Sequence, residues 1–482
     1  MALHMAVEVV RDSSDSLTSQ IQDFIKREIT GGILHPGTRL PSSRRLADDL
    51  DVSRSVVVEA YGQLVAEGYL EAVQGAGTRV VRHLDGGRSV VPALLEEPAA
   101  PGAPDGGPGA PGPHDGEPAR PVRWDLRPSG GNIPAFPRRE WLSCYQRVLY
   151  AADPADHDYP SLAGEADLRL ELARFLGRLR GVRTSPGQLM VVAGFAQTLG
   201  LMCAALPRLG IHALAIEDPG HPGQRQFVRE SGLRAVPVPV DAEGIDVAAL
   251  AASGARAVLV TPAHQFPTGV TLSPRRREQL CRWAREVDGW VLEDDYDGGL
   301  WYEPGARPLA LQRTDPERVV YAGTASKSLA PGLRLGWLAA PEPVLDLLLR
   351  ARARQDLGTE TLTQLTFAEL LRSGLFDRHL RRLNSLARSR RECLEEAVRR
   401  HLPGAAVLGR GAGLHAYLRL PRGTDEAALV ARALRRSVLL RGAAPFHAGP
   451  GRSAPALVVG HAHLPRSGVS EAVRALAAAA WR

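Results

Sequence analysis

The stretch 323-GTASKSLAPGLRLG-336 contains Lys327, one of only two lysines in a chain of 482 residues. Lysine and arginine together number 59, so almost every basic residue is an arginine. An arginine side chain stays protonated, whereas a desolvated lysine amine can lose its proton and attack a carbonyl carbon. Since the sequence otherwise uses arginine, we interpret Lys327 as a site of amine chemistry. Lys26, which precedes Arg27 on an amphipathic stretch, is interpreted as a surface charge.

Length and composition predict a multidomain globular protein. A hydrophobic content of 44% and a charged content of 23% are typical of globular chains, and the net charge of +6 is compatible with a polyanionic partner. No apolar run approaches the ~20 residues that a membrane helix needs, and we recognise no signal peptide pattern. The cysteines are widely spaced, so we expect a reducing compartment and no metal site. They are Cys144, Cys203, Cys281 and Cys393.

Residues 1–83 are predicted to form a winged helix-turn-helix, in which two short helices precede a β-hairpin. Ser42 or Ser43 is placed to cap the second helix, which begins at Arg44. The segment has 9 basic and 11 acidic side chains, so DNA contacts would depend on individual arginines rather than on net charge. The expected elements are helices over 16–29, 44–50 and 53–64 and a hairpin over 68–81.

A Pro- and Gly-rich stretch, 84–122, is predicted to be a flexible linker. Residues 123–482 alternate apolar runs with helical stretches, which indicates an α/β domain with a largely parallel sheet. We expect a large subdomain over about 150–340 and a smaller α+β subdomain over about 341–482, beginning with Arg-rich helices and ending with a helix over 469–481. Candidate strands are 189–192, 214–217, 235–239, 257–261, 290–293 and 319–321.

An acidic stretch, 293-EDDY-296, lies at the end of a predicted strand. A carboxylate at this place can hold a pyridine nitrogen protonated, which makes the ring an electron sink. Asp294 is our choice for this role, and Asp295 is the alternative. Tyr296 could then hydrogen-bond a phenolic oxygen of the same ring. Together with an imine-forming Lys327, the pattern indicates an aldehyde-bearing pyridine cofactor.

A phosphate site is predicted where strand 189–192 turns into a helix. A glycine allows the turn, and the free backbone amides at the helix start favour an anion. The lysine loop would add a hydroxyl and a guanidinium to the same phosphate. The expected set is Gly194, Phe195, Ala196 and Gln197 on one side, and Thr324 or Ser326 with Arg334 on the other.

Two further loops follow predicted strands and should lie at the edge of the sheet where ligands bind. In 261-TPAHQFPTG-269, either His264 or Gln265 is placed over that edge. In 218-DPGHP-222, His221 can stack on a ring.

These motifs resemble those of known families. Residues 16–81 resemble the GntR-type DNA-binding domain, through 40-LPSSRRLA-47 and 52-VSRS-55. Residues 123–482 resemble the aspartate aminotransferase fold, fold type I, which uses pyridoxal 5′-phosphate (PLP). The two in one chain resemble the MocR-type transcriptional regulators. The motifs typical of that group are 218-DPG-220, 264-HQFPTG-269, 293-EDDYD-297 and the Lys327 loop.

The resemblance implies roles for individual residues. Lys327 would be the internal aldimine lysine, Asp294 the partner of the pyridinium nitrogen, and Tyr296 the partner of the cofactor's O3′. The implied phosphate set is Thr324, Ser326 and Arg334.

The sequence departs from the resemblance at two places. His221 stands where the group usually has a tyrosine, so the ring-stacking contact is altered. Aminotransferases of this fold usually carry an arginine near the last strand to bind a substrate carboxylate, whereas 456-ALVVGH-461 has none. The nearest arginines, Arg441 and Arg452, are expected in loops.

The helix that begins near Ser53 should enter the DNA major groove by its N-terminal end, and the hairpin tip could enter the minor groove. An arginine that binds guanine through two hydrogen bonds is the commonest specific contact. Candidate DNA-binding residues are Arg39, Ser42, Arg44, Arg45, Ser53, Arg54, Ser55, Gly75 and Gly77.

We therefore expect a ligand-responsive transcription factor that binds operator DNA as a homodimer and senses PLP, or PLP with an amino acid or amine. We expect regulation rather than turnover, although the aminotransferase-like domain could support imine exchange or half-transamination. We also expect a cytoplasmic, nucleoid-associated location. One alternative is an active aminotransferase that carries a DNA-binding module. Another is a regulator that senses PLP alone and controls vitamin B6 synthesis.

Overall fold

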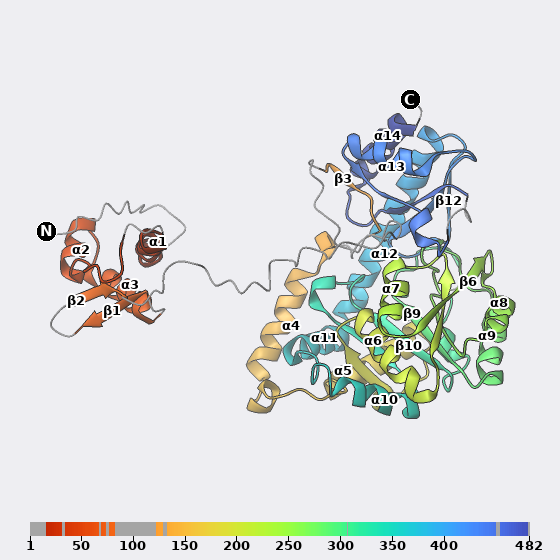
Figure 1. Cartoon of the computed structure of the whole chain (residues 1–482), viewed down its shortest axis with the longest axis horizontal. Coiled ribbons are helices and arrows are strands. Elements are labelled where there is room, and N and C mark those ends of the chain that lie inside the picture. The colour runs from red at the N-terminus through yellow and green to blue at the C-terminus, as the bar shows by residue number, and fades with distance from the viewer. Residues whose placement is uncertain are drawn as a thin grey trace. The chain divides into compact units, whose positions relative to one another are not determined.

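The computed structural model describes residues 16–30, 34–66, 69–73, 77–81, 122–128, 133–305, 307–449 and 454–480. The chain divides into two compact units, residues 1–107 and 108–482, which we describe separately (Figure 1). The predicted linker, apart from residue 122, lies outside the described residues, as does the expected DNA contact Gly75.

The N-terminal unit is the predicted winged helix-turn-helix. Its helices pack around one apolar core that includes Ile21, Ile25, Leu46, Val57 and Leu64, all without exposed surface. The strands of its hairpin pair antiparallel. The elements are α1 (Leu17–Thr30), α2 (Ser43–Leu50), α3 (Arg54–Ala66), β1 (Leu70–Val73) and β2 (Gly77–Val80).

Local hydrogen bonds position α2 and α3, the two helices of the helix-turn-helix. Ser42, rather than Ser43, caps α2, because its hydroxyl accepts a hydrogen bond from the backbone N–H of Arg45 at 3.2 Å. The Tyr61 hydroxyl on α3 donates to the carbonyl oxygen of Pro41 at 3.0 Å, which ties α3 to the segment before α2.

The larger unit is built on an eight-stranded sheet in the order β4-β11-β10-β9-β8-β5-β6-β7. The central pairs are parallel, and all six predicted strands are confirmed. Two strands, β7 and β11, were not predicted, and β11 runs antiparallel to both of its neighbours. The strands are β4 (Leu189–Val192), β5 (Ala213–Asp218), β6 (Arg234–Asp241), β7 (Gly244–Ile245), β8 (Ala257–Val260), β9 (Trp290–Asp295), β10 (Val319–Thr324) and β11 (Gly336–Ala339).

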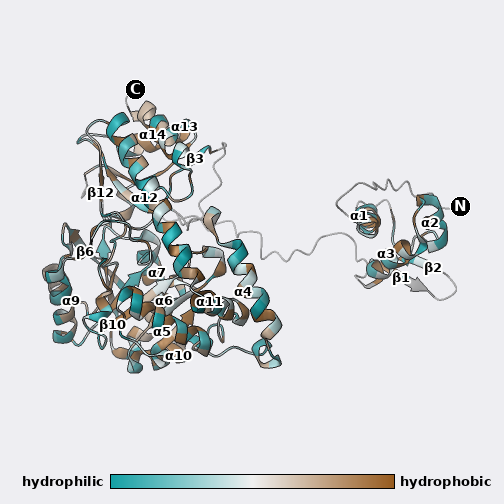
Figure 2. Cartoon of the chain, turned by 180° about the vertical axis from the view of Figure 1, so that it is seen from behind, coloured by the Kyte–Doolittle hydropathy of each residue, from teal (hydrophilic) through white to brown (hydrophobic). Residues whose placement is uncertain are grey.

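Helices cover both faces of this sheet, because successive strand residues point to opposite sides. On β4, Met190 and Val192 pack with α6 and α10, whereas Leu189 and Val191 pack with α5 and α11. The outer helix α9 is largely hydrophilic (teal in Figure 2). These helices are α4 (Arg138–Ala151), α5 (Ala166–Arg180), α6 (Phe195–Ala205), α7 (Pro222–Glu230), α8 (Val247–Ala252), α9 (Pro274–Glu286), α10 (Glu342–Arg352) and α11 (Thr361–Arg372).

Helix α12 (Leu375–His401) leads from the large subdomain into a small one (Figure 1). The small subdomain has an antiparallel sheet in the order β12-β13-β16-β15, covered by α13 and α14, and a short parallel pair of β3 with β14. Its elements are β3 (Trp124–Asp125), β12 (Ala406–Leu408), β13 (His415–Arg419), α13 (Glu426–Arg435), β14 (Val438–Leu439), β15 (Arg441–Gly442), β16 (Ala456–Gly460) and α14 (Arg466–Ala480).

The expected subdomain boundary at residue 341 is wrong. Helices α10 and α11 follow that residue, yet they pack against the large sheet through Leu345, Leu348 and Phe367. The small-subdomain core instead begins within α12, at Leu394, and takes in Leu126 from the start of the unit. Because Leu126 and α12 lie far apart in sequence, apolar periodicity alone could not predict that they share a core.

Single-turn helices complete the fold, at Ile133–Ala135, Pro154–His157, Pro186–Gln188, Leu206–Leu209, Leu311–Arg313, Pro331–Leu333 and Ala444–Phe446. Within the part of the chain that the structure describes, no helix is both long enough and apolar enough to cross a membrane.

Candidate functional site

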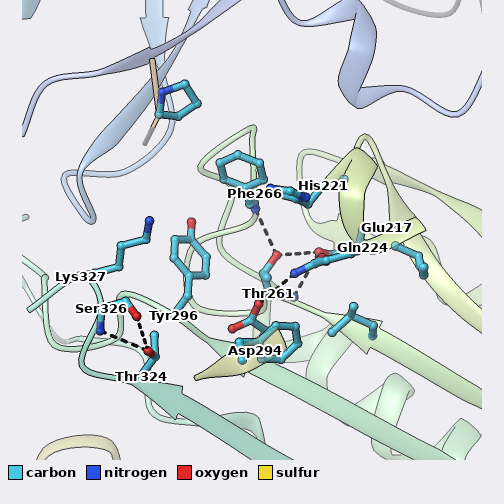
Figure 3. A pocket seen from close by; sticks show the side chains of 15 residues that line it. Glu217, His221, Gln224, Thr261, Phe266, Asp294, Tyr296, Thr324, Ser326 and Lys327 are labelled. Carbon is cyan, nitrogen blue, oxygen red and sulfur yellow. Dashed lines mark hydrogen bonds between the residues drawn. The ribbon is translucent and has the colours of Figure 1, made fainter. Parts of the chain in front are cut away.

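A cavity of about 220 Å³ lies at the carboxyl ends of the parallel strands β5, β8, β9 and β10 (Figure 3). Ligands in open α/β sheets bind at this edge. The structure brings seven of the expected cofactor residues into its lining: Phe195, His221, Asp294, Tyr296, Thr324, Ser326 and Lys327. The other lining residues are Pro128, Ile216, Glu217, Gly220, Gln224, Leu259, Thr261 and Phe266.

The acidic residues of β9 point to alternate sides of the sheet. Asp295 pairs with Arg180 at 2.7 Å and accepts a hydrogen bond from the Tyr321 hydroxyl, also at 2.7 Å. Glu293 lies on the same side and accepts backbone hydrogen bonds from the start of a helical turn. Asp294 therefore faces the cavity. Asp295, the alternative choice, is held on the opposite face by a buried ion pair.

Asp294 is buried with one oxygen unsatisfied. Its Oδ1 has no hydrogen-bond partner among the described residues, and its Oδ2 has only a long contact of 3.4 Å from the Gln224 amide. Burial raises the pKa of Asp294 well above its usual value, and the charges of Asp295 and Asp297 raise it further. An unpaired buried carboxylate oxygen is costly, so the site fits a ligand that brings a protonated nitrogen.

Lys327 lies across the cavity from Asp294, and its amine points to the same side as the Tyr296 hydroxyl (Figure 3). Burial lowers the pKa of the Lys327 amine, although the charges of Asp297 and Asp294 oppose this shift. A lowered pKa increases the unprotonated fraction, which is the nucleophilic form.

Contrary to expectation, neither His264 nor Gln265 lines the cavity. The His264 carbonyl oxygen accepts a hydrogen bond from the Tyr296 hydroxyl at 2.9 Å, so His264 positions a lining residue. The Gln265 amide donates to the backbone of its own loop and of the preceding one, at Phe266 and Pro219. Phe266 of the same loop lines the cavity instead.

The structure also brings His264, Asp297 and His415 together, with one potential ligand atom of each within 4.8 Å of the others. His264 Nδ1 and Asp297 Oδ2 are hydrogen-bonded to each other at 2.8 Å. The cluster is buried behind Tyr296, outside the cavity lining.

Two loops meet where the phosphate was expected. Gly194, at φ 89°, precedes α6, and a Cβ atom there would lie 3.4 Å from the Arg334 guanidinium. That guanidinium donates to the carbonyl oxygen of Ala193, and a Cβ atom on Gly336 would lie only 2.8 Å from the Gly194 Cα. The close approach requires both glycines.

On the lysine loop, the hydroxyls of Thr324 and Ser326 lie 2.9 Å apart, so both expected alternatives are present side by side. Phe195, in the first turn of α6, lines the cavity, whereas the Ala196 side chain does not. The arrangement of helix start, hydroxyls and guanidinium can bind an anion.

His221 lies at the start of α7, with its ring centroid 5.7 Å from that of Phe266. Burial lowers the pKa of His221 to about 4, helped by nearby positive charges that include Lys327. The ring is therefore neutral at pH 7 and can pack on an aromatic ligand.

Sequence reasoning missed Glu217 and Thr261. Glu217 Oε2 accepts hydrogen bonds from the Thr261 hydroxyl at 2.6 Å and its backbone N–H at 3.1 Å. Burial raises the pKa of Glu217 to about 7. Both residues lie at or just beyond the ends of predicted strands, the same signal that identified Asp294.

In the N-terminal unit, the expected DNA contacts that fall on described residues are all exposed. Arg39 lies against Gly77 of the hairpin, since a Cβ atom on Gly77 would lie 3.3 Å from the Arg39 Nε. The Ser53 and Ser55 hydroxyls lie 2.8 Å apart at the start of α3. The exposed set is Arg39, Ser42, Arg44, Arg45, Ser53, Arg54, Ser55 and Gly77.

Comparison with known proteins identifies both units. Residues 17–80 match the family of bacterial regulatory proteins, gntR family, and residues 132–476 match aminotransferase class I and II. The probable rhizopine catabolism regulatory protein MocR of Rhizobium meliloti is 30% identical, over 87% of this chain and 85% of that protein. The HTH-type pyridoxine biosynthesis transcriptional regulator PdxR of Corynebacterium glutamicum is 31% identical, over 84% and 83%.

Among solved structures, the multiple substrate aminotransferase of Thermococcus profundus matches with a TM-score of 0.68 and 26% identity, over 76% of this chain and 92% of that one. The larger unit therefore has fold type I. The chain belongs to the MocR-type transcriptional regulators, which join a gntR-type DNA-binding domain to an aminotransferase class I and II domain.

We predict that Glu217→Gln changes the pH dependence of stability. Because folding raises the pKa of Glu217 from 4.5 to about 7, its contribution is present below pH 4.5 and lost as pH rises through 7. Between pH 5 and 8, the free energy of unfolding of wild type should fall by up to about 3 kcal/mol more than that of the glutamine variant. Urea unfolding at the two pH values measures this. Identical losses in both proteins would contradict it, and exposed Glu317→Gln is the control.

Proposed function

We propose that this regulator binds PLP at Lys327 and that occupancy of the cavity controls its binding to operator DNA. One observation carries the proposal: an oxygen of the buried Asp294 has no partner among the residues that the structure describes, and it faces a cavity that also holds Lys327. A pyridine nitrogen that stays protonated at neutral pH supplies the missing partner.

PLP would supply an aldehyde for a covalent link to an amine and a ring that withdraws electrons. Asp294 would hold the ring nitrogen, and Tyr296, oriented by the His264 carbonyl, would bind the phenolic oxygen. His221 would pack against the ring. The phosphate would lie between Gly194 and the Thr324, Ser326 and Arg334 side chains.

A ligand that alters the cavity can shift the protein between conformations only if it binds them with different affinity. The cavity is lined mainly by the large subdomain, but Pro128 comes from the segment that joins the small subdomain. We infer that PLP, or PLP with an amino compound, shifts the relative position of the two subdomains and thereby the DNA-bound form. The relative named for pyridoxine biosynthesis favours regulation of vitamin B6 or amino-compound metabolism.

A second candidate function is turnover as an aminotransferase, since solved structures of that class share the fold. Repeated turnover of an amino acid with a keto acid would support it, whereas at most a single half-reaction supports regulation. A cytoplasmic, nucleoid-associated location stays a prediction of the regulatory proposal.

We further propose that the protein is a homodimer. Helix α4 has buried Cys144 but leaves large apolar side chains exposed, and an exposed apolar surface favours association with a second copy. On α4 and the segment after it, these are Leu142 (55%), Leu149 (44%), Tyr150 (88%) and Tyr159 (83%).

We predict that Lys327→Ala abolishes the visible absorbance of protein-bound PLP, because the covalent link needs the ε-amine. Purified protein is incubated with PLP, dialysed and examined by absorbance. Lys26→Ala, which removes the other lysine, should keep the band. A yellow Lys327→Ala protein after dialysis would contradict the assignment.

We predict that Arg54→Ala reduces the preference for operator over random DNA by about 1–3 kcal/mol, because an arginine at the start of α3 can read base edges. Gel-shift titrations at fixed salt measure both affinities, and the exposed Arg474→Ala on α14 serves as control. Equal losses on operator and random DNA would indicate a phosphate contact and contradict base reading.

We predict that the double variant Leu142→Glu, Leu149→Glu is monomeric where wild type is a dimer, because two buried charges would oppose association. Light scattering after gel filtration measures the mass. The control is Leu434→Glu, an exposed leucine of α13. A variant that still elutes as a dimer would place the interface elsewhere.

A further inference from the structure

Three side chains with metal-binding atoms meet where the two subdomains face each other. His264 and Asp297 follow strands β8 and β9 of the large subdomain, whereas His415 is the first residue of β13 in the small one. One donor atom of each residue lies within 4.8 Å of the others, and all three residues are buried. Figure 3 shows parts of the small subdomain above Tyr296, which contacts the same cluster through its hydroxyl.

The His264 and Asp297 side chains already lie at the spacing of two ligands of one ion. His264 Nδ1 is 2.8 Å from Asp297 Oδ2. Bonds from zinc to nitrogen and oxygen are about 2.0–2.2 Å long, so neighbouring ligand atoms on one ion lie roughly 3 Å apart. Since ligands bind metals in their deprotonated form, an ion would take the place of the proton in this hydrogen bond.

The small subdomain reaches this pair through a glycine. A Cβ atom on Gly413, at φ 62°, would lie 2.0 Å from Asp297 Oδ2 and 2.7 Å from His264 Nδ1. No larger residue could pass so close to the pair. This close approach brings His415, two residues further on, to a ring-centroid distance of 4.7 Å from His264.

His415 has a ring nitrogen that is not used elsewhere. Its Nε2 is buried and has no hydrogen-bond partner among the described residues. Both ring nitrogens of His461 share this property, and the His461 backbone N–H donates to the carbonyl oxygen of Leu414, next to His415. Burial lowers the pKa of His415 well below its usual value, so the ring is neutral, as a metal ligand must be. Buried polar atoms without partners indicate a missing water or ion.

Charge and space at the cluster fit one cation with a water. Positive charges on Lys327 and Arg391 act on His415, and the Asp297 carboxylate supplies the opposing negative charge. Asp297 also lines a second cavity, of about 30 Å³, which Tyr296 and Lys327 share. A water needs about 10–15 Å³ of such space, so this cavity can hold a water as a further ligand.

We propose that His264, Asp297 and His415 bind a divalent transition metal ion, with zinc as the first choice, and that this ion cross-links the two subdomains. Two imidazoles and a carboxylate are a donor set typical of zinc and its first-row neighbours, whereas magnesium and calcium prefer oxygen ligands. The expectation of no metal site rested on the spacing of the cysteines, but these donors come from three segments far apart in sequence. The inference does not depend on PLP.

The test titrates a metal into the full-length protein. Protein stripped with a chelator is titrated with Co²⁺, following the d–d absorbance, and Zn²⁺ is then added in competition. Wild type should bind one Co²⁺ per chain and lose the band to Zn²⁺. His415→Leu and Asp297→Asn should each weaken Co²⁺ binding at least about 10- to 100-fold, because even the loss of an outer-shell partner has that effect. The control is His212→Ala, which removes an exposed histidine and should bind like wild type.

A cysteine at position 415 provides an arm that does not depend on a loss. His415→Cys keeps a metal-binding atom, so thiolate-to-cobalt charge-transfer absorbance should appear that wild type, with its own four cysteines, does not show. Zn²⁺ should also raise the thermal unfolding midpoint of wild type but not of His415→Leu, because an ion bound only to the folded state stabilises it.

The proposal is overturned if wild type takes up no Co²⁺, or if His415→Leu and Asp297→Asn bind it as tightly as wild type, since the ion would then lie on other side chains. It is also overturned if His415→Cys binds Co²⁺ without a charge-transfer band. PLP uptake is measured separately by its visible absorbance, so none of these results refutes the proposed function. A protein that binds Co²⁺ at the cluster but takes up no PLP would refute the proposed function alone.

Discussion

The alternation of three acidic residues along β9 is the constraint on which the site depends. Arg180 and Tyr321 hold Asp295 on one face of the sheet, and this fixes Asp294 on the other, toward the cavity. A buried carboxylate without a full set of partners is costly, and one oxygen of Asp294 has no hydrogen-bond partner within the described part of the chain. The Asp294 carboxylate therefore requires a hydrogen-bond donor from a ligand in the cavity, opposite Lys327.

Segments from distant parts of the sequence surround the cavity and connect the two subdomains. Gly194 and Gly336 allow the loop before α6 to approach the lysine loop closely enough for Arg334 to bridge them. The 27-residue helix α12 begins in the core of the large subdomain, at Phe376, and ends in that of the small one, at Leu394 and beyond. Helix α12 thus connects the two subdomains, and a ligand would change their relative position only if it bound the two arrangements with different affinity.

The sequence predicted the elements whose signal is local. Six strands, the winged helix-turn-helix and the residues Lys327 and Asp294 follow from apolar runs, turn residues and strand ends. What it could not predict depends on contacts between distant segments. The antiparallel strand β11 begins at Gly336, the last residue of the lysine loop stretch, and the pairing of β3 with β14 joins residues more than 300 positions apart.

The same reason explains the errors within the site. His264 and Gln265 were placed over the sheet edge because they follow a strand. The His264 ring is instead hydrogen-bonded to Asp297, the Gln265 amide donates to backbone oxygens of its own loop and the preceding one, and Phe266 lines the cavity. Arg441 was assigned to a loop, but it lies in β15 and pairs with Val458, and a two-residue strand has no periodicity to recognise. Glu217 was overlooked although it follows the rule that identified Asp294.

Trapping the cofactor on its lysine tests the assignment of Lys327 most directly. Purified protein is incubated with PLP, reduced with borohydride, digested and mapped by mass spectrometry. We expect a phosphopyridoxyl group on the peptide that contains Lys327 and none on the peptide that contains Lys26. An unmodified Lys327, or a group distributed equally between the two lysines, would contradict it.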